Sequence, residues 1–106
     1  MKYYVFAEMD LTDGGWVTEY VQIVTKMVER HGGRYLARTS RVEKLEGERP
    51  APQVVLLIEW PSREVAMAFY ESEEYRPYRD SRIAGSRSEL ALIAGEDVTR
   101  AATIAE

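Results

Sequence analysis

The chain has 106 residues, of which 45% are hydrophobic and 30% are charged, and this size and composition predict one globular domain. Its formal net charge of −4 argues against a nucleic-acid binder, which usually presents a basic face. The lack of cysteine excludes disulfides, thiolate metal sites and a cysteine nucleophile. No apolar run is long enough for a signal peptide or a membrane span, so we expect a cytoplasmic protein without a membrane partner.

The first half of the domain begins with a strand and an amphipathic helix. Residues 2–10 are rich in Tyr, Val and Phe, which favour a strand. Either Thr12 or Asp13 is expected to cap the helix that follows. Apolar residues recur at i, i+3, i+4 and i+7 across 16–31, so this segment should bury one helical face. The glycine pair 32–33 should end it.

The second half repeats this order after a hairpin. Residues 34–46 alternate loosely and predict a long second strand, and 53–60 form the most apolar strand, expected at the centre of the sheet. Residues 63–71 predict a second helix, and a further short helix is expected within 72–87, with a break near its proline. Residues 88–95 alternate again and predict the last strand.

The order β-α-β-β-α-β predicts an α+β protein with a ferredoxin-like fold, built on the split βαβ motif. Right-handed crossovers then give an antiparallel sheet of strand order 4-1-3-2, with helices on one face only. We expect this domain to span residues 1–96. Residues 97–106 carry little pattern and are expected to be a mobile tail or an arm that contacts a partner.

Alternation along the strands assigns side chains to the two faces of the sheet. Glu59 is expected on the uncovered face, because the bulkier apolar set of its strand should pack under the helices: Val54, Leu56, Ile58 and Trp60. The hairpin is expected to set Arg38 opposite Glu59 or its neighbour, which would put both side chains on the uncovered face. Tyr4 should lie near the same end.

The uncovered face is otherwise largely apolar, with Phe6, Leu36, Val55 and Leu57. A face of this kind predicts a two-fold homodimer through the sheet, which would enclose a small-molecule pocket. Two interpretations of Arg38 and Glu59 remain open. They are either polar groups of that pocket or a cross-strand ion pair that sets the register.

Other residues give further candidates for chemistry. His31, the only histidine, is either a general base or pH switch, or a cation that stabilises the end of its helix. A cluster in the second half either lines a pocket mouth and binds an anion or forms a solvated helix with aromatic anchors: Tyr70, Tyr75, Tyr78, Arg76, Arg79 and Arg82. No metal or cofactor is expected, because one histidine and no cysteine do not support a transition-metal site, no DxD-type spacing supports a Mg²⁺ site, and no dinucleotide or P-loop pattern is present.

Several of these segments together resemble the domain-of-unknown-function family DUF1330 over about residues 2–96. They are the opening Tyr4–Glu8, HGGRYLAR at 31–38, the strand from Val54 to Ser62, AFYES at 68–72 with Glu74-Tyr75, and Arg82. The resemblance implies a ferredoxin-like subunit of the dimeric α/β-barrel superfamily, whose members include antibiotic-biosynthesis-type monooxygenases and muconolactone isomerases. It also implies that Arg38, Tyr75 and Arg82 line a pocket. The chain departs from the family at Thr39-Ser40, where Gly-Gly is frequent.

These observations support three functional hypotheses. The first is a cofactor-independent enzyme acting on a small anionic or aromatic metabolite, in which Arg38 orients the substrate and Glu59 or His31 moves a proton. Tyr4, Tyr75 and Arg82 would then bind the substrate. The second is a non-catalytic dimer that binds a metabolite, and the third is a structural dimer with no ligand.

Overall fold

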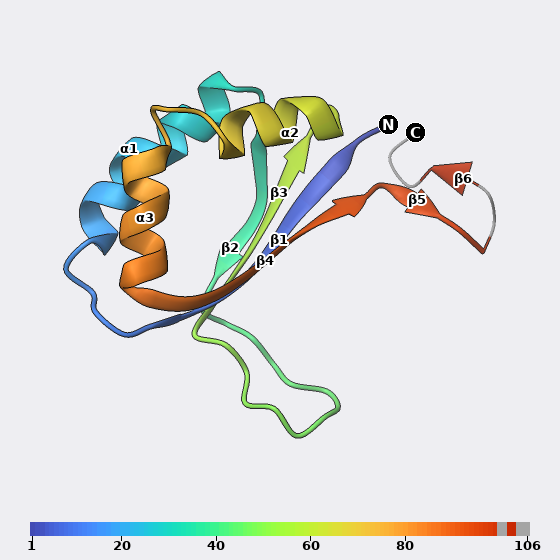
Figure 1. The fold of residues 1–106 in the computed structure, drawn as a ribbon. Helices are drawn as coiled ribbons and strands as arrows, with labels where there is room; N and C mark the ends of the chain where they lie inside the picture. The colour runs from blue at the N-terminus through green and yellow to red at the C-terminus, as the bar shows by residue number, and fades with distance from the viewer. Residues whose placement is uncertain (100–101, 104–106) are drawn as a thin grey trace.

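β1 (Tyr3–Leu11) runs through the sheet between β3 (Val54–Trp60) and β4 (Ser86–Ala94), as the computed structural model in Figure 1 shows. β2 (Arg34–Thr39) pairs with β3 at one edge. All neighbouring strands are antiparallel and the order is β2-β3-β1-β4, which is the predicted order counted from the other edge. The ferredoxin-like α+β prediction is therefore confirmed.

Three helices lie on one face of this sheet (Figure 1): α1 (Val17–Arg30), α2 (Arg63–Tyr70) and α3 (Arg76–Ala84). The opposite face is uncovered. The structure describes residues 1–99 and 102–103, and within them β5 (Glu96–Asp97) pairs with β6 (Ala102–Thr103) in a small separate hairpin. The rest of the predicted tail lies outside the described residues.

The start of α1 differs from the prediction. The helix begins after Trp16, which makes no side-chain cap, while the Asp13 carboxylate accepts a hydrogen bond from the Gly15 N–H at 3.0 Å instead. The Trp16 indole N–H and the Thr12 and Asp13 N–H groups all donate to the carbonyl oxygen of Gly85, at 3.2, 3.0 and 3.1 Å. The turn is thus held to the end of α3, and this packing sets the first residue of α1.

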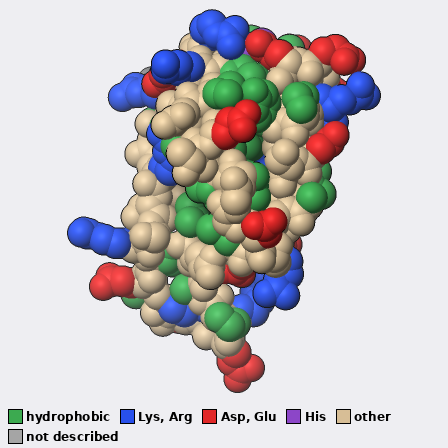
Figure 2. All heavy atoms as spheres, turned by 90° about the vertical axis from the view of Figure 1, so that its left-hand side faces the viewer, with side chains coloured by type: hydrophobic (Ala, Val, Ile, Leu, Met, Phe, Trp, Pro, Cys, Tyr) green, Lys and Arg blue, Asp and Glu red, His purple; other side chains and the backbone are tan. Residues whose placement is uncertain are grey.

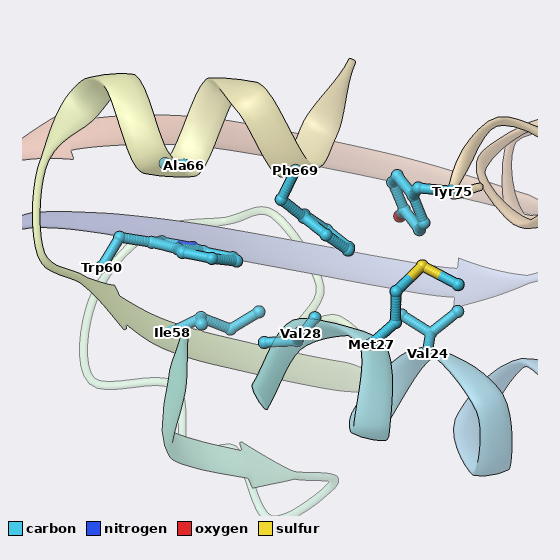
Figure 3. Close-up of a cluster of buried hydrophobic side chains, with 8 residues drawn as sticks. All are labelled: Val24, Met27, Val28, Ile58, Trp60, Ala66, Phe69 and Tyr75. Atoms are coloured by element: carbon cyan, nitrogen blue, oxygen red, sulfur yellow. The ribbon is translucent and has the colours of Figure 1, made fainter. Parts of the chain in front are cut away.

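The hydrophobic core lies between the helices and the sheet (Figure 3), and comprises Val24, Met27, Val28, Ile58, Trp60, Ala66, Phe69 and Tyr75. The rings of Trp60 and Phe69 stack at 5.3 Å between centroids, and Phe69 and Tyr75 follow at 4.5 Å. α1 ends beside this core, where Gly32 adopts a φ of 98° that a residue with a Cβ rarely takes. The predicted glycine stop is confirmed.

The second strand is where the prediction of faces fails. β2 ends at Thr39, and residues 40–53 form a long loop to β3 (Figure 1). The register pairs Tyr35 with Ile58 but Ala37 with Leu57, so a bulge interrupts the alternation between them.

This bulge puts Arg38 opposite Leu56, on the face that the helices cover, whereas Glu59 is paired with Arg34. Glu59 lies on the uncovered face as predicted, and it forms an ion pair with Lys2 at 3.2 Å. The predicted pairing of Arg38 with Glu59 is therefore wrong. An odd residue in a bulge reverses which face each following side chain takes, and alternation alone does not reveal it.

Candidate functional site

An apolar cavity of about 200 Å³ lies between the helices and the sheet. Its floor includes one row of cross-strand partners that crosses all four strands, Arg38, Leu56, Ala7 and Leu90. An apolar cavity of about 150 Å³ is enough to admit benzene. The space therefore suits one ring with a few substituents. The sequence predicts a pocket on the uncovered face, whereas this cavity lies under the helices.

The cavity reaches the surface beside α1. Leu11, Val21 and Leu90 line it and are also exposed. Figure 2 views the side of the molecule that carries α1 and α3, where hydrophobic side chains gather along the middle, with Lys and Arg at the edges and some acidic side chains among the hydrophobic ones. Exposed Ile23 and Ile83 belong to these same helices. The mouth of the cavity is thus bordered by apolar side chains.

Arg82 is a buried cation in the wall of this cavity, with 3% of its surface exposed. Its Nε donates to the Tyr75 hydroxyl at 3.4 Å, and among the described residues no carboxylate lies within ion-pair distance of it. Burial by itself lowers the pKa of Arg82, but its interactions with Tyr75 and then Tyr20 outweigh burial and raise this pKa. The cavity therefore contains a positive charge that no acidic side chain of the described chain neutralises.

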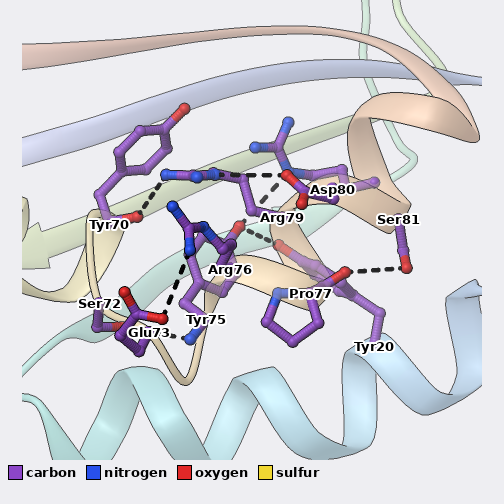
Figure 4. Close-up of polar contacts among 11 residues, drawn as sticks. Tyr20, Tyr70, Ser72, Glu73, Tyr75, Arg76, Pro77, Arg79, Asp80 and Ser81 are labelled. Carbon is purple, nitrogen blue, oxygen red and sulfur yellow. Dashed lines mark hydrogen bonds and ion pairs between the residues drawn. The ribbon is translucent and has the colours of Figure 1, made fainter.

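Tyr75 connects Arg82 to α1. Its hydroxyl shares a hydrogen bond of 2.6 Å with the Tyr20 hydroxyl, and Figure 4 shows the two side chains pointing toward each other. Both tyrosines line the cavity. Burial, followed by the charge and hydrogen bond of Tyr75, raises the pKa of Tyr20 far above its usual value, so this hydroxyl stays protonated even at alkaline pH. The pair can donate a proton in a hydrogen bond to an oxyanion.

Only part of the predicted Tyr–Arg cluster turns inward. Arg76 forms an ion pair with Glu73 at 3.5 Å, and Arg79 donates to the Tyr70 carbonyl oxygen at 3.1 Å (Figure 4). These contacts fix the chain that leads into α3. They leave Tyr75 and Arg82 as the members of the cluster that combine burial with a polar group in the cavity wall.

Arg38 lies at the rim of the same cavity. Its Nη1 donates to the Thr25 hydroxyl at 2.7 Å, and its guanidinium lies 4.0 Å from the centre of the Tyr35 ring. The side chain is exposed, yet Arg38, Thr25 and Tyr35 all line the cavity. The bulge in β2 is what turns Arg38 to this side.

The other predicted site residues do not line the cavity. Glu59 and Tyr4 are cross-strand partners on the uncovered face. His31 follows the last residue of α1, where its Nε2 contacts the Glu74 carboxylate and its ring meets Phe69 edge-on at 5.5 Å between centroids. Arg38, Tyr75 and Arg82 thus line one cavity, and Glu59, Tyr4 and His31 lie outside it.

Tyr20 is a residue of this site that the sequence analysis did not select. Tyr20 lies on the apolar face predicted for the first helix. Its hydroxyl is the sequence feature that indicates a polar role, because a hydroxyl on a buried face needs a hydrogen-bond partner. Trp60 also lines the cavity, and its buried indole N–H has no hydrogen-bond partner among the described residues.

Across residues 1–99 and 102–103, no group of three or more His, Asp or Glu side chains is arranged to hold a metal ion. The helices of this same part of the chain are too short or too polar to cross a membrane.

Comparison with known proteins identifies a family and a shared fold. The family model described as "Domain of unknown function (DUF1330)" matches residues 2–96, whereas none of the curated proteins matches the chain. The RPA0582 protein of unknown function from Rhodopseudomonas palustris superposes with a TM-score of 0.73 at 15% identity, covering 87% of this chain and 80% of that one. SnoaB from Streptomyces nogalater, described as a cofactor-independent oxygenase, superposes with a TM-score of 0.62 at 14% identity, covering 91% and 94%. At these identities the likeness establishes the fold.

Proposed function

The chain belongs to the DUF1330 family, and we propose that it is a cofactor-independent enzyme acting on a small anionic or aromatic metabolite bound between its helices and its sheet. One observation carries this proposal: Arg82 is buried in the wall of an apolar cavity, without an acidic partner among the described residues. A buried charge without a partner costs stability, so its position favours a ligand that supplies the missing negative charge.

The chemistry that this geometry supports is the stabilisation of an anion. The apolar walls would hold the body of the molecule, while Arg82 and the Tyr75 hydroxyl would donate hydrogen bonds to its carboxylate, enolate or phenolate oxygen. Fixed donors in a site of low dielectric constant stabilise such charge more strongly than water does. Tyr20 would donate to Tyr75 and so strengthen the donor that faces the ligand.

The roles first expected for Glu59 and His31 receive no support from this geometry. A general base has to reach its proton directly or through one water, and neither side chain lines the cavity. Arg38 retains its expected role of orienting an acidic group, now from the rim of the cavity under the helices. SnoaB, which shares the fold, supports a reaction without a cofactor at the level of fold alone.

A non-catalytic metabolite-binding dimer is the second candidate. The observation that favours it is that, within residues 1–99 and 102–103, no carboxylate or imidazole lines the cavity, so the lining offers an anion site without an obvious base. The same residues would then bind a metabolite that leaves unchanged. A structural dimer is disfavoured, because an unfilled cavity that contains a cation contributes nothing to a purely structural role.

The dimer itself is proposed to form through the uncovered face of the sheet. Phe6, Val55 and Leu57 lie on this face next to exposed Leu36 and Ile93. A second copy of the chain would cover this apolar surface. We propose a cytoplasmic location, since a chain without cysteine needs no oxidising compartment to form disulfides.

A thermal-shift screen of single-ring carboxylic acids and phenols tests the function, followed by mass spectrometry of each hit after incubation. Binding stabilises the native state, by about 2.7 kcal/mol at a concentration of 100 times Kd. We expect hits that stabilise the wild type and the Arg76→Gln variant, whose substitution is exposed, but not Arg82→Gln. A mass change in the compound supports the enzyme, and unchanged compounds support the binding dimer. Hits that stabilise Arg82→Gln equally would contradict both candidates.

A further inference from the structure

Two arginines line the cavity from different sides, Arg38 from β2 and Arg82 from α3. We propose that the ligand class of this cavity is a small dianion, with an apolar ring or spacer that carries an acidic group at each end. Arg82 would bind the inner acidic group and Arg38 the outer one. This inference rests on the proposed function, since it concerns the same cavity, and it specifies which anions the cavity selects.

The topology separates the two cations. β2 is one edge of the sheet, and β4 is the other. α3 leads directly into β4 and packs against both β4 and α1. Edge strands of a four-stranded sheet are about 14 Å apart, and the two arginine side chains approach the cavity from these two sides. A ligand between them would have a cation at each end.

α1 indicates how far apart the two acidic groups should be. The Thr25 hydroxyl accepts a hydrogen bond from Arg38. The Tyr20 hydroxyl is hydrogen-bonded to the Tyr75 hydroxyl, which in turn accepts from Arg82. These two residues of α1 are five positions apart, which corresponds to about 7.5 Å along a helix axis. Such a spacing fits two acidic groups on opposite ends of one ring better than two acidic groups on adjacent atoms.

Both guanidinium groups keep donors for a ligand. A guanidinium has five N–H donors, and among the described residues the side chain of each arginine makes one hydrogen bond, to Thr25 and to Tyr75 respectively. In the part of the chain that the structure describes, no acidic side chain lines the cavity to occupy the remaining donors. Each arginine can therefore bind a carboxylate through two parallel hydrogen bonds.

The two positions should contribute unequally. Arg82 is buried, so its attraction for an anion is only weakly screened, whereas Arg38 is exposed and its attraction should weaken as salt is added. Arg82 would then bind any monoanion, and Arg38 would add the preference for a second charge. A purely structural role for Arg38, packing on Tyr35, predicts no such preference.

Isothermal titration calorimetry of the full chain with terephthalate, a dianion, and p-toluate, a monoanion of similar shape, separates these possibilities. We expect the wild type to bind terephthalate about tenfold more tightly than p-toluate, because one added charge-assisted pair contributes on this scale. Arg38→Gln should abolish that preference while its affinity for p-toluate stays close to that of the wild type. Arg82→Gln should weaken the binding of both acids. Arg41→Gln is the matched control, because Arg41 is exposed, follows β2 and lies outside the cavity.

The outcomes distinguish the two levels of proposal. Equal wild-type affinity for the two acids, or a preference that survives in Arg38→Gln, would overturn the dianion inference. If Arg82→Gln still weakened the binding of both acids in that case, the proposed function would stand. Binding of neither acid would overturn the inference, and the broader screen would then judge the proposed function by itself. Arg38→Lys, which keeps the charge but not the paired donors, should retain part of the preference for terephthalate.

Discussion

The hydroxyl oxygens of Tyr20 and Tyr75 lie 2.6 Å apart, and the Nε atom of Arg82 lies 3.4 Å from the Tyr75 oxygen. These three side chains join α1, the segment before α3 and α3 itself inside the cavity wall. The hydroxyl of Tyr75 is the only group that contacts both of the others. It therefore fixes the position of the Arg82 guanidinium and links it to the Tyr20 hydroxyl.

Tyr75→Phe should destabilise the protein by about 1–3 kcal/mol, because it leaves the Tyr20 hydroxyl and the Arg82 Nε without their shared partner in a buried site. Urea denaturation gives the free energy of unfolding. Tyr78→Phe serves as the control, since Tyr78 is half-buried in α3, three residues after Tyr75, and a change within about 0.5 kcal/mol is expected there. Equal effects of the two substitutions would show that the Tyr75 hydroxyl is not an anchor.

Arg82→Met should leave the free energy of unfolding unchanged or raise it, because a buried charge gives way to an apolar side chain of similar length. The same variant should lose the stabilisation by acidic ligands. Unchanged or higher stability together with lost ligand binding is expected when a residue contributes to binding at a cost in stability. The measurement is urea denaturation with and without a ligand identified in the screen, and Arg76→Met is the exposed control. A loss of more than about 2 kcal/mol without ligand would instead indicate a structural role for Arg82.

Alkaline pH should lower the free energy of unfolding, partly because the Tyr20 hydroxyl ionises in the unfolded chain. Burial raises its pKa in the folded state, so above pH 10 the unfolded chain loses the phenol proton while the folded chain keeps it. The unfolded state then binds fewer protons, and the free energy of unfolding should fall by up to about 1.4 kcal/mol per pH unit from this one group. The contribution is fully present below pH 10 and disappears as pH rises.

Comparison of the wild type with Tyr20→Phe between pH 8 and pH 11 isolates this effect. The phenylalanine variant lacks the ionising group, so its stability should decline less steeply above pH 10. Urea denaturation at each pH gives the two slopes. Parallel curves would mean that the Tyr20 hydroxyl ionises as readily in the folded protein as in the unfolded chain.

Leu57→Arg should convert the proposed dimer into a monomer without unfolding it. Leu57 lies on the uncovered face, paired with Phe6 on β1 and with Ala37 on β2, so a second copy would have to bury the new charge. Size-exclusion chromatography with light scattering gives the mass, and circular dichroism checks the fold. Ile83→Arg is the control, because Ile83 is an exposed apolar residue of α3 on the helical side. A monomeric wild type, or a dimer that persists in Leu57→Arg, would rule out this interface.

Local patterns in the sequence determined the order of the elements and the two faces of β3. Alternation correctly put Glu59 on the uncovered face and Ile58 and Trp60 under the helices, because β3 is regular and its side chains follow the strand period. The apolar spacing of the first helix and the glycines after it likewise predicted α1 and its end. The resemblance to DUF1330 rested on the same segments, and the match to residues 2–96 confirms it.

Only the tertiary structure decided where the candidate site lies. The face of Arg38 depends on a bulge in β2, and a bulge is set by the register against β3 rather than by any local period. The inward direction of Arg82 depends on how α3 packs on α1, which brings the Tyr20 hydroxyl to Tyr75. The sequence could name Arg38, Tyr75 and Arg82 as candidates. It could not place them around one cavity, because contacts between segments far apart in the chain determine that arrangement.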